Sequence, residues 1–145
     1  MRKPIGRHGQ GRQFAALPLA ERDGETMVLL VTSRETGRWV LPKGWAEKGL
    51  TGPELAAKEA FEEAGVIGEV TAEAVGSYSY SKAMPKARSM DCRVKVFLMR
   101  VDRLLKNWPE HKQRRRKWFT LPQAAMAVDD GELVTLLLRL AAPEV

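Results

Sequence analysis

The sequence predicts a single α/β domain in which a mixed β-sheet lies between helices. Apolar strand candidates alternate along the chain with helix candidates. No internal repeat and no long linker divides the chain, and 145 residues is close to the commonest size of one domain. We expect residues 1–12 to form a flexible basic tail and residues 13–145 to form the domain.

The composition indicates a globular protein that is neither disordered nor disulfide-bonded. Hydrophobic residues make up 44% of the chain and charged residues 29%. The one cysteine, Cys92, excludes an intramolecular disulfide and fits a reducing compartment, and we expect a buried, inert thiol. No apolar run approaches the roughly 18 residues that span a bilayer. We therefore expect a cytoplasmic protein without a membrane partner, either a monomer or a homodimer.

The predicted domain opens with an apolar hairpin. Residues 13–19 and 27–33 are strand candidates, and residues 21–24, which include Asp-Gly, form the turn between them. A short apolar run at 39–41 then enters a loop rich in glycine and lysine, residues 42–49.

The helix that follows carries start and stop signals. Thr51 and Glu54 form a predicted capping box, with Pro53 in the first turn, where its missing N–H has no cost. Gly65 is placed to end the helix as the left-handed residue beyond its C-terminus.

Three carboxylates project from one face of this helix, because Glu59, Glu62 and Glu63 are spaced i, i+3 and i+4. Like charges this close repel one another, and a bound divalent cation removes that repulsion; hard cations such as Mg²⁺ prefer oxygen ligands. The alternative is a solvated acidic face. The opposite side is small and apolar, which favours packing on a sheet, and consists of Ala57, Ala60, Phe61 and Ala64.

Strand candidates continue after the helix at residues 68–75, 77–81 and 92–101, with a polar loop through Pro85 before the last of them.

The C-terminal region is predicted to be mainly helical. Residues 118–121 are short and extended, and Thr120 can cap a helix over residues 122–127. Residues 130–132 open a final helix, in which leucines repeat at helical spacing on one face. These leucines are Leu133, Leu136, Leu137 and Leu140.

The segment 44–66 resembles the Nudix box, G-x5-E-x7-R-E-U-x-E-E-x-G-U, where U is a bulky aliphatic residue. Its fixed positions are matched without insertion or deletion by Gly44, Glu59, Glu62, Glu63, Gly65 and Val66. Leu50 stands in place of the first Glu, Lys58 replaces the Arg, and Ala60 is small for its aliphatic position. The resemblance implies the Nudix fold, an α/β/α sandwich with a central mixed β-sheet.

The Nudix resemblance also implies a pyrophosphohydrolase that acts on acid anhydrides with Mg²⁺ or Mn²⁺. Glu59, Glu62 and Glu63 would be the metal ligands, with the Gly44 carbonyl as a helper, and a water would attack phosphorus. One of the three glutamates is also a candidate general base, because crowding of like charges raises a carboxyl pKa. Which glutamate it is stays open.

The departures from the box leave a second hypothesis, a non-catalytic Nudix module that binds a phosphorylated ligand. Leu50 and Lys58 are the residues that favour it. We expect Lys58 to pair instead with Glu54, one turn earlier, in the favourable orientation.

The charge of the chain, +6 with a pI of 9.7, favours a small, phosphate-rich anionic substrate. The basic run 112–117 is the densest, with a solvated loop as the alternative. Nucleic acid is possible but not favoured: basic patches near aromatic side chains such as Tyr80 and Trp118 can follow a backbone, but no recognised motif supports it. Trp45 is expected to pack over the helix rather than stack on a base.

Two further segments, 38–44 and 114–119, are similar to the diphosphoinositol polyphosphate phosphohydrolase branch of the Nudix superfamily, whose members cleave inositol pyrophosphates and diadenosine polyphosphates. The analogy implies a dinucleoside polyphosphate or diphosphoinositol polyphosphate substrate. A Nudix enzyme that acts on RNA 5′ ends stays open. By the same analogy, the phosphate-binding residues would be Arg34, Arg38, Lys43 and Arg115.

Overall fold

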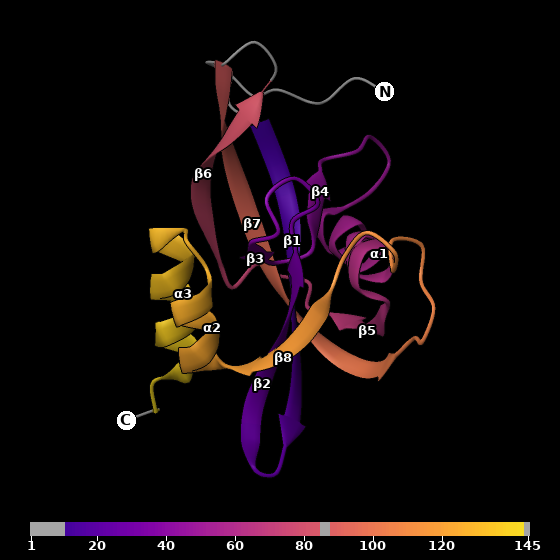
Figure 1. Ribbon diagram of the computed structural model, residues 1–145, viewed down its shortest axis with the longest axis vertical. Coiled ribbons are helices and arrows are strands. Elements are labelled where there is room, and N and C mark those ends of the chain that lie inside the picture. The colour runs from indigo at the N-terminus through magenta and orange to yellow at the C-terminus, as the bar shows by residue number, and fades with distance from the viewer. Residues whose placement is uncertain (1–10, 85–87, 144–145) are drawn as a thin grey trace.

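The computed structural model describes residues 11–84 and 88–143, and it confirms the predicted α/β/α sandwich. Helix α1 (Gly52–Ala64) lies on one side of the sheet, and α2 (Leu121–Ala127) and α3 (Gly131–Ala141) lie on the other (Figure 1). Within the described residues the strands are β1 (Gly11–Arg22), β2 (Glu25–Thr32), β3 (Trp39–Val40), β4 (Lys43–Trp45), β5 (Val66–Val70), β6 (Gly76–Met84), β7 (Arg88–Leu104) and β8 (Arg116–Thr120).

The sheet is mixed because β1 runs parallel to β7, whereas the other described pairs are antiparallel. Along the edge of β1 opposite β7, residues 19–22 pair with β2 and residues 13–15 pair with β4. Strand β2 instead continues beside β3 and β8. Because β2 pairs with only one end of β1, the other end is free to pair with β4. Strand β4 carries Gly44 and lies next to α1.

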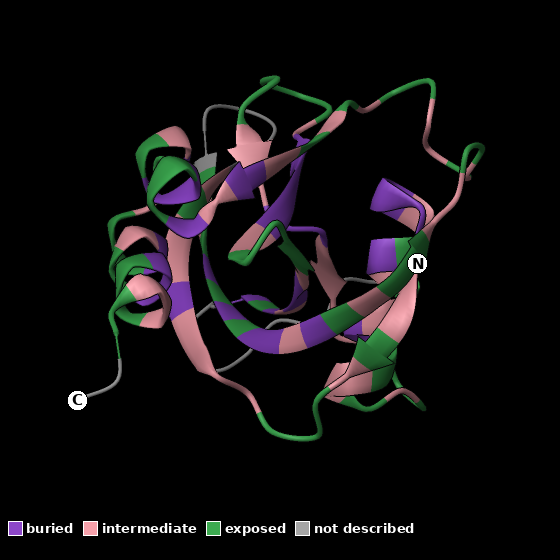
Figure 2. Cartoon of the chain, turned by 90° about the horizontal axis from the view of Figure 1, so that it is seen from below, coloured by how far each residue is buried: buried purple, intermediate pink, exposed green. Residues whose placement is uncertain are grey.

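Each face of the sheet has its own core, because side chains alternate along the strands. In β1, Ala15 and Leu17 face α2 and α3, while Ala16 faces α1. In β7, Val94 and Val96 face α2 and α3, whereas Phe97 and Met99 face α1. Figure 2 shows buried segments between partly buried and exposed ones along the strands and on the flanking helices.

The predicted hairpin and C-terminal helices are confirmed. Asp23 and Gly24 both have positive φ in the turn between β1 and β2, as a two-residue hairpin loop requires. Thr120 caps α2 through a capping box with Gln123. On α3 the expected leucine face is buried at three positions, whereas the fourth is half-buried; the buried leucines are Leu133, Leu136 and Leu137.

The expected basic tail, residues 1–12, was predicted two residues too long at its C-terminal end. Gly11 and Arg12 belong to β1, where they pair with Cys92 and Arg93 of β7. The rest of the expected tail, residues 1–10, lies outside the described part of the chain. Cys92 is buried, as predicted. Within the described residues, no helix is long and apolar enough to span a membrane.

Two strand predictions in the middle of the chain need correction. Strand β5 ends at Val70 rather than at residue 75. The Thr71 amide still donates to the Leu98 carbonyl of β7 at 2.9 Å, but its hydroxyl donates to the Glu73 carbonyl, and the chain bends there. Strand β6 continues to Met84, where we expected a polar loop, because it forms a long antiparallel hairpin with β7. Pro85 lies outside the described residues.

The packing face of α1 is also rotated from the one predicted. Ala60 and Ala64 are fully buried as expected, but Phe61 is 39% exposed and Ala57 is half-buried. The buried stripe includes Glu63 instead, at 6% exposure. This rotation removes one of the three predicted surface carboxylates from water and places it between the helix and the sheet.

Candidate active site

Helix α1 is fixed at both ends by the local interactions that the sequence predicted. Thr51 Oγ1 accepts from the Glu54 amide at 3.2 Å, and Glu54 Oε1 accepts from the Thr51 amide at 2.8 Å. Gly65 has a φ of 65° and ends the helix in the left-handed conformation. Arg116 adds a tertiary contact, because its guanidinium donates to the Ala64 carbonyl at 2.7 Å. The carboxylates of α1 are therefore held on a rigid element.

A cavity of about 1050 Å³ opens beside α1. Its lining comes from segments that are distant in sequence, including β1, β4, β6, α1 and the loop before β8. Five of the residues predicted for the site line it: Arg34, Lys43, Gly44, Glu59 and Glu63.

Glu59 and Glu63 meet at this cavity. Their carboxyl groups share a hydrogen bond, and Glu63 Oε1 accepts from the Lys43 amide at 3.3 Å. Burial raises the pKa of Glu63 to about 8, against a lowering effect of Arg114, and burial also raises the pKa of Glu59. Burial thus disfavours the ionised form of both carboxyls, and a bound cation would favour it.

Gly44 makes this arrangement sterically possible. A Cβ at this position would overlap the carboxylate of Glu59. The glycine that the Nudix resemblance singled out therefore lets the backbone of β4 approach the acidic face of α1 closely.

Glu62 does not line the cavity, although we predicted it as a third ligand. Among residues 11–84 and 88–143, no three side chains of His, Cys, Asp or Glu are arranged as a cluster that could hold a metal ion. However, Oε2 of Glu62 is buried without a hydrogen-bond partner. An unpaired buried carboxylate oxygen on the same helix as two carboxyls with raised pKa is a donor set that fits a hard divalent cation.

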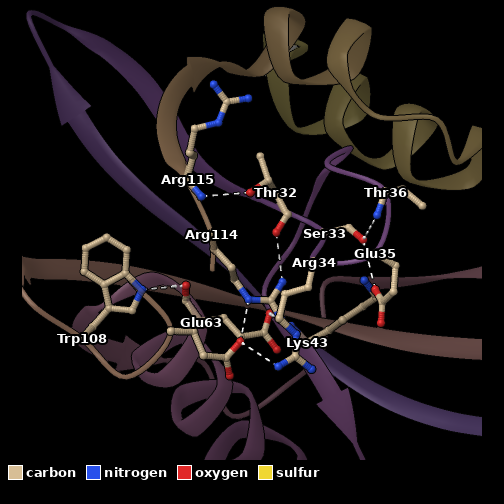
Figure 3. A network of polar contacts seen from close by, with 11 residues as sticks. Thr32, Ser33, Arg34, Glu35, Thr36, Lys43, Glu63, Trp108, Arg114 and Arg115 are labelled. Carbon is tan, nitrogen blue, oxygen red and sulfur yellow. Dashed lines mark hydrogen bonds and ion pairs between the residues drawn. The ribbon is translucent and has the colours of Figure 1, made fainter. Parts of the chain in front are cut away.

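The structure reveals an ion-pair network that the sequence reasoning missed. Arg114 Nε donates to Glu110 Oε1 at 2.7 Å, and Arg114 Nη2 lies 3.7 Å from Glu63 Oε1 (Figure 3). Arg114 Nη1 also donates to the Thr32 carbonyl at 3.0 Å. The Arg114 side chain is only 9% exposed. Because we treated residues 112–117 as one basic loop, the inward direction of this arginine was not recognised.

Two of the predicted phosphate-binding arginines do not line the main cavity. Arg115 turns its guanidinium toward Trp39, 5.9 Å from the ring centroid, and away from Glu63 (Figure 3). Arg38 pairs with Asp129 at 3.1 Å beside a smaller cavity of about 130 Å³. Arg34 does line the main cavity, where its Nη1 lies 3.9 Å from Glu110 Oε1.

The side of the cavity opposite α1 is aromatic and basic. Lys43 Nζ lies 5.2 Å from the centroid of Tyr80, and the Tyr80 hydroxyl donates to Gln13 Oε1 at 2.8 Å. Burial lowers the pKa of Lys43. Trp45, which we expected over the helix, lines the cavity, and its ring packs against Gly11 of β1.

Lys58 does not pair with Glu54, as we had expected. Its ammonium donates to both carboxylate oxygens of Glu47, each at 3.0 Å. The carboxylate of Glu54 is already occupied by the Thr51 amide in the capping box, so it faces the helix end rather than Lys58.

A family model described as NUDIX domain matches residues 9–137. The chain belongs to the Nudix family. It is 34% identical over 114 residues to Nudix hydrolase 16, mitochondrial, of Arabidopsis thaliana, covering 72% of this chain and 63% of that protein. It is also 30% identical over 107 residues to diphosphoinositol polyphosphate phosphohydrolase 3-alpha of Mus musculus, with 72% and 60% covered. The Nudix domain thus spans about half to two thirds of the length of the curated relatives it matches.

Solved structures confirm the Nudix fold. A C. elegans Ap4A hydrolase superposes with a TM-score of 0.64 at 18% identity, covering 90% of this chain and 96% of the other. The NUDIX domain of Shewanella oneidensis NrtR, complexed with ADP ribose, superposes with a TM-score of 0.68 at 14% identity, covering 92% and 89%. At these identities the likeness shows the fold alone.

Proposed function

We propose that this Nudix domain is a Mg²⁺- or Mn²⁺-dependent hydrolase that cleaves a pyrophosphate linkage in a small, highly anionic substrate. The observation that carries the proposal is the pair of half-buried Glu59, which lies against Gly44, and buried Glu63 at a large cavity. Two carboxyls with raised pKa at a cavity are a common arrangement in catalytic sites.

The metal in this proposal would be held by Glu59, Glu62 and Glu63, with the Gly44 carbonyl as a further oxygen donor. When bound, such an ion neutralises non-bridging phosphate oxygens and lowers the pKa of a coordinated water. The Arg114 guanidinium favours the ionised form of Glu63, which is the form that a ligand needs. Arg114 therefore acts on the site through the carboxylate and not through the substrate.

The substrate class follows from the cations that line the cavity. Lys58 and Arg114 are held by carboxylates at 3.0 and 2.7 Å. Arg34 Nη1 lies 3.9 Å from Glu110 Oε1, a longer contact than the other two. We propose that the remaining cations among the described lining residues contact phosphates together with Arg34, and they are Lys43, Lys48 and Lys82. The cavity volume is at the upper end of the range, about 300–1,000 Å³, that is usual for small-molecule sites.

We therefore propose a substrate with four or more phosphates, of the dinucleoside polyphosphate or diphosphoinositol polyphosphate class. The mouse relative is named for diphosphoinositol polyphosphates and the C. elegans neighbour for Ap4A, and both ligands belong to this class. Lysines and arginines around one cavity raise the local concentration of such an anion and orient its phosphates.

A phosphate-release screen with Mg²⁺ tests the proposal. The panel contains dinucleoside polyphosphates, diphosphoinositol polyphosphates, nucleoside triphosphates, ADP-ribose and 5′-capped RNA. We expect the substrates with four or more phosphates to be cleaved fastest. Selectivity for ADP-ribose would contradict the substrate class, and preference for capped RNA would favour the RNA alternative. Binding of these ligands without any hydrolysis would favour the non-catalytic module.

Glu62→Gln tests whether Glu62 is a metal ligand. It keeps the shape of the side chain and removes its charge, so we expect turnover to fall by at least about a hundredfold with the fold intact. Unchanged turnover would show that Glu62 is not a ligand.

A further inference from the structure

Lys58 places a positive charge among the residues proposed to bind the metal. It is adjacent to Glu59 and one helical turn before Glu62, so both carboxylates attract its ammonium. Its four-carbon stem is flexible, and an ammonium is a mobile point charge. A lysine here is thus able to form an ion pair with a metal ligand and compete with the cation.

Glu47 prevents that pairing in the structure. Both of its carboxylate oxygens accept from Lys58 Nζ at 3.0 Å. Glu47 belongs to the loop after β4 and lines the main cavity. The side chains of Glu47 and Lys58 are 26% and 42% exposed, so the pair is only partly screened by water.

Leu50 has no carboxylate to offer Lys58, and a turn before α1 brings the carboxylate of Glu47 to Lys58 instead. The Leu50 amide donates to the Glu47 carbonyl at 3.2 Å, which closes a tight turn just before α1. The turn therefore brings a carboxylate from three residues earlier to the side chain of Lys58.

The other carboxylates within reach of Lys58 differ in availability. Glu54 is engaged by the Thr51 amide. Glu62, one helical turn after Lys58, has one oxygen without a hydrogen-bond partner, so it has unused acceptor capacity. If Glu47 lost its charge, the Lys58 ammonium would be drawn to Glu62 and Glu59.

We propose that Glu47 is a positioning residue that holds Lys58 away from Glu59 and Glu62, so that these carboxylates remain available to a divalent cation. The inference rests on the proposed function, because it assumes that the carboxylates bind a metal. It assigns a role to Glu47 that its position outside the fixed residues of the Nudix box does not indicate.

A double-mutant cycle on Mn²⁺ binding tests this role without a substrate. Mn²⁺ affinity is measured by isothermal titration calorimetry and by electron paramagnetic resonance for the full chain, E47Q, K58Q and E47Q/K58Q. We expect E47Q to weaken binding about fivefold when Lys58 is present and by less than about 1.5-fold when Lys58 is absent. Thermal unfolding of each variant checks that the fold is retained.

Glu69→Gln is the matched control. Glu69 pairs with Arg100 at 3.2 Å, and both side chains are more than half exposed. Val66 and Val70 of the same strand, β5, pack on the α1 side, so the side chain of Glu69 lies on the opposite face. The control makes the same change of charge outside the cavity lining, so we expect Mn²⁺ affinity to stay as in the unmodified chain.

The possible outcomes separate this inference from the proposed function. Equal Mn²⁺ affinity of E47Q and the unmodified chain would overturn the inference alone. Equal weakening by E47Q with and without Lys58 would also overturn it, because Glu47 would then act through its own charge or as a ligand. Absence of Mn²⁺ binding by the unmodified chain would overturn the proposed function and this inference together.

Discussion

The two faces of the sheet use similar helix caps but bury different side chains. Helices α1 and α2 both begin with a capping box, Thr51 with Glu54 and Thr120 with Gln123. On the face of α2 and α3, leucines fill the core and no described carboxylate is buried. On the face of α1, alanines approach the sheet and Glu63 is buried with them.

This difference shows that the α1 face is less stabilising than the leucine face, because it holds carboxyl groups at a cavity. Small residues such as Ala56, Ala60 and Ala64 let the helix lie close to β1 and β7, which brings its carboxylates to the cavity. Burial of a carboxyl opposes its ionisation and so destabilises the metal-free protein at high pH. The leucine face has no such conflict and contributes stability alone.

Glu63→Gln is expected to have the largest effect, and it should lower turnover while it raises stability at high pH. Turnover should fall by at least about a hundredfold, because a proposed ligand loses its charge. Steady-state kinetics at saturating Mg²⁺ measures this. Retained turnover would remove Glu63 from the site and with it the contrast between the two faces.

The same substitution should change how stability depends on pH. Since the pKa of Glu63 rises from 4.5 to about 8 on folding, its contribution to stability is complete below about pH 4.5 and is lost as the pH rises through about 8. In a chelator, Glu63→Gln should therefore become more stable than the unmodified chain as the pH increases across this range. Urea unfolding at pH 5, 7 and 9 measures the crossover; parallel stability curves would contradict the raised pKa.

Leu137→Ala is the opposite test, on the other face. Leu137 is fully buried in the leucine core, so its truncation should lower the free energy of unfolding by about 2–5 kcal/mol. Turnover per folded molecule should not change, because Leu137 does not line either described cavity. Denaturant unfolding and active-site-normalised kinetics check both parts, and a large loss of turnover would show that the two faces are coupled.

Gly44→Ala sharpens the comparison at the boundary of the site. The new methyl group would overlap the Glu59 carboxylate and displace it, so we expect turnover to fall by about tenfold or more. Gly131→Ala at the exposed start of α3, where a Cβ meets no atom within 4 Å and φ is not positive, is the control for loss of a glycine. Normal turnover of Gly44→Ala would mean that Glu59 can move without consequence.

The caps give the smallest expected effects. Thr51→Ala and Thr120→Ala should each lower the free energy of unfolding by about 1 kcal/mol, because each removes one side-chain acceptor from a helix N-terminus. Only Thr51→Ala should also reduce Mn²⁺ affinity, since α1 carries the acidic side chains. Equal Mn²⁺ affinity of the two variants would show that fraying of α1 does not reach Glu59.

The sequence alone determined the features that depend on residues close together in the chain. The capping box of α1, its end at Gly65 and the Asp23–Gly24 turn were all predicted correctly, because each is made by contacts over a few residues. The alternation of strands and helices was sufficient for the fold class. The Nudix resemblance supplied the remaining assignment of the glutamates.

Only the tertiary structure decided which side chains meet at the cavity. Helical spacing predicted that Glu63 lies on an acidic face. It did not predict that Glu63 is buried, because burial depends on how α1 is rotated against β1 and β4. The inward turn of Arg114 and the outward turn of Arg115 depend in the same way on contacts with Thr32 of β2. Ion pairs between distant segments are set by packing, so the sequence could supply the charges but not their partners.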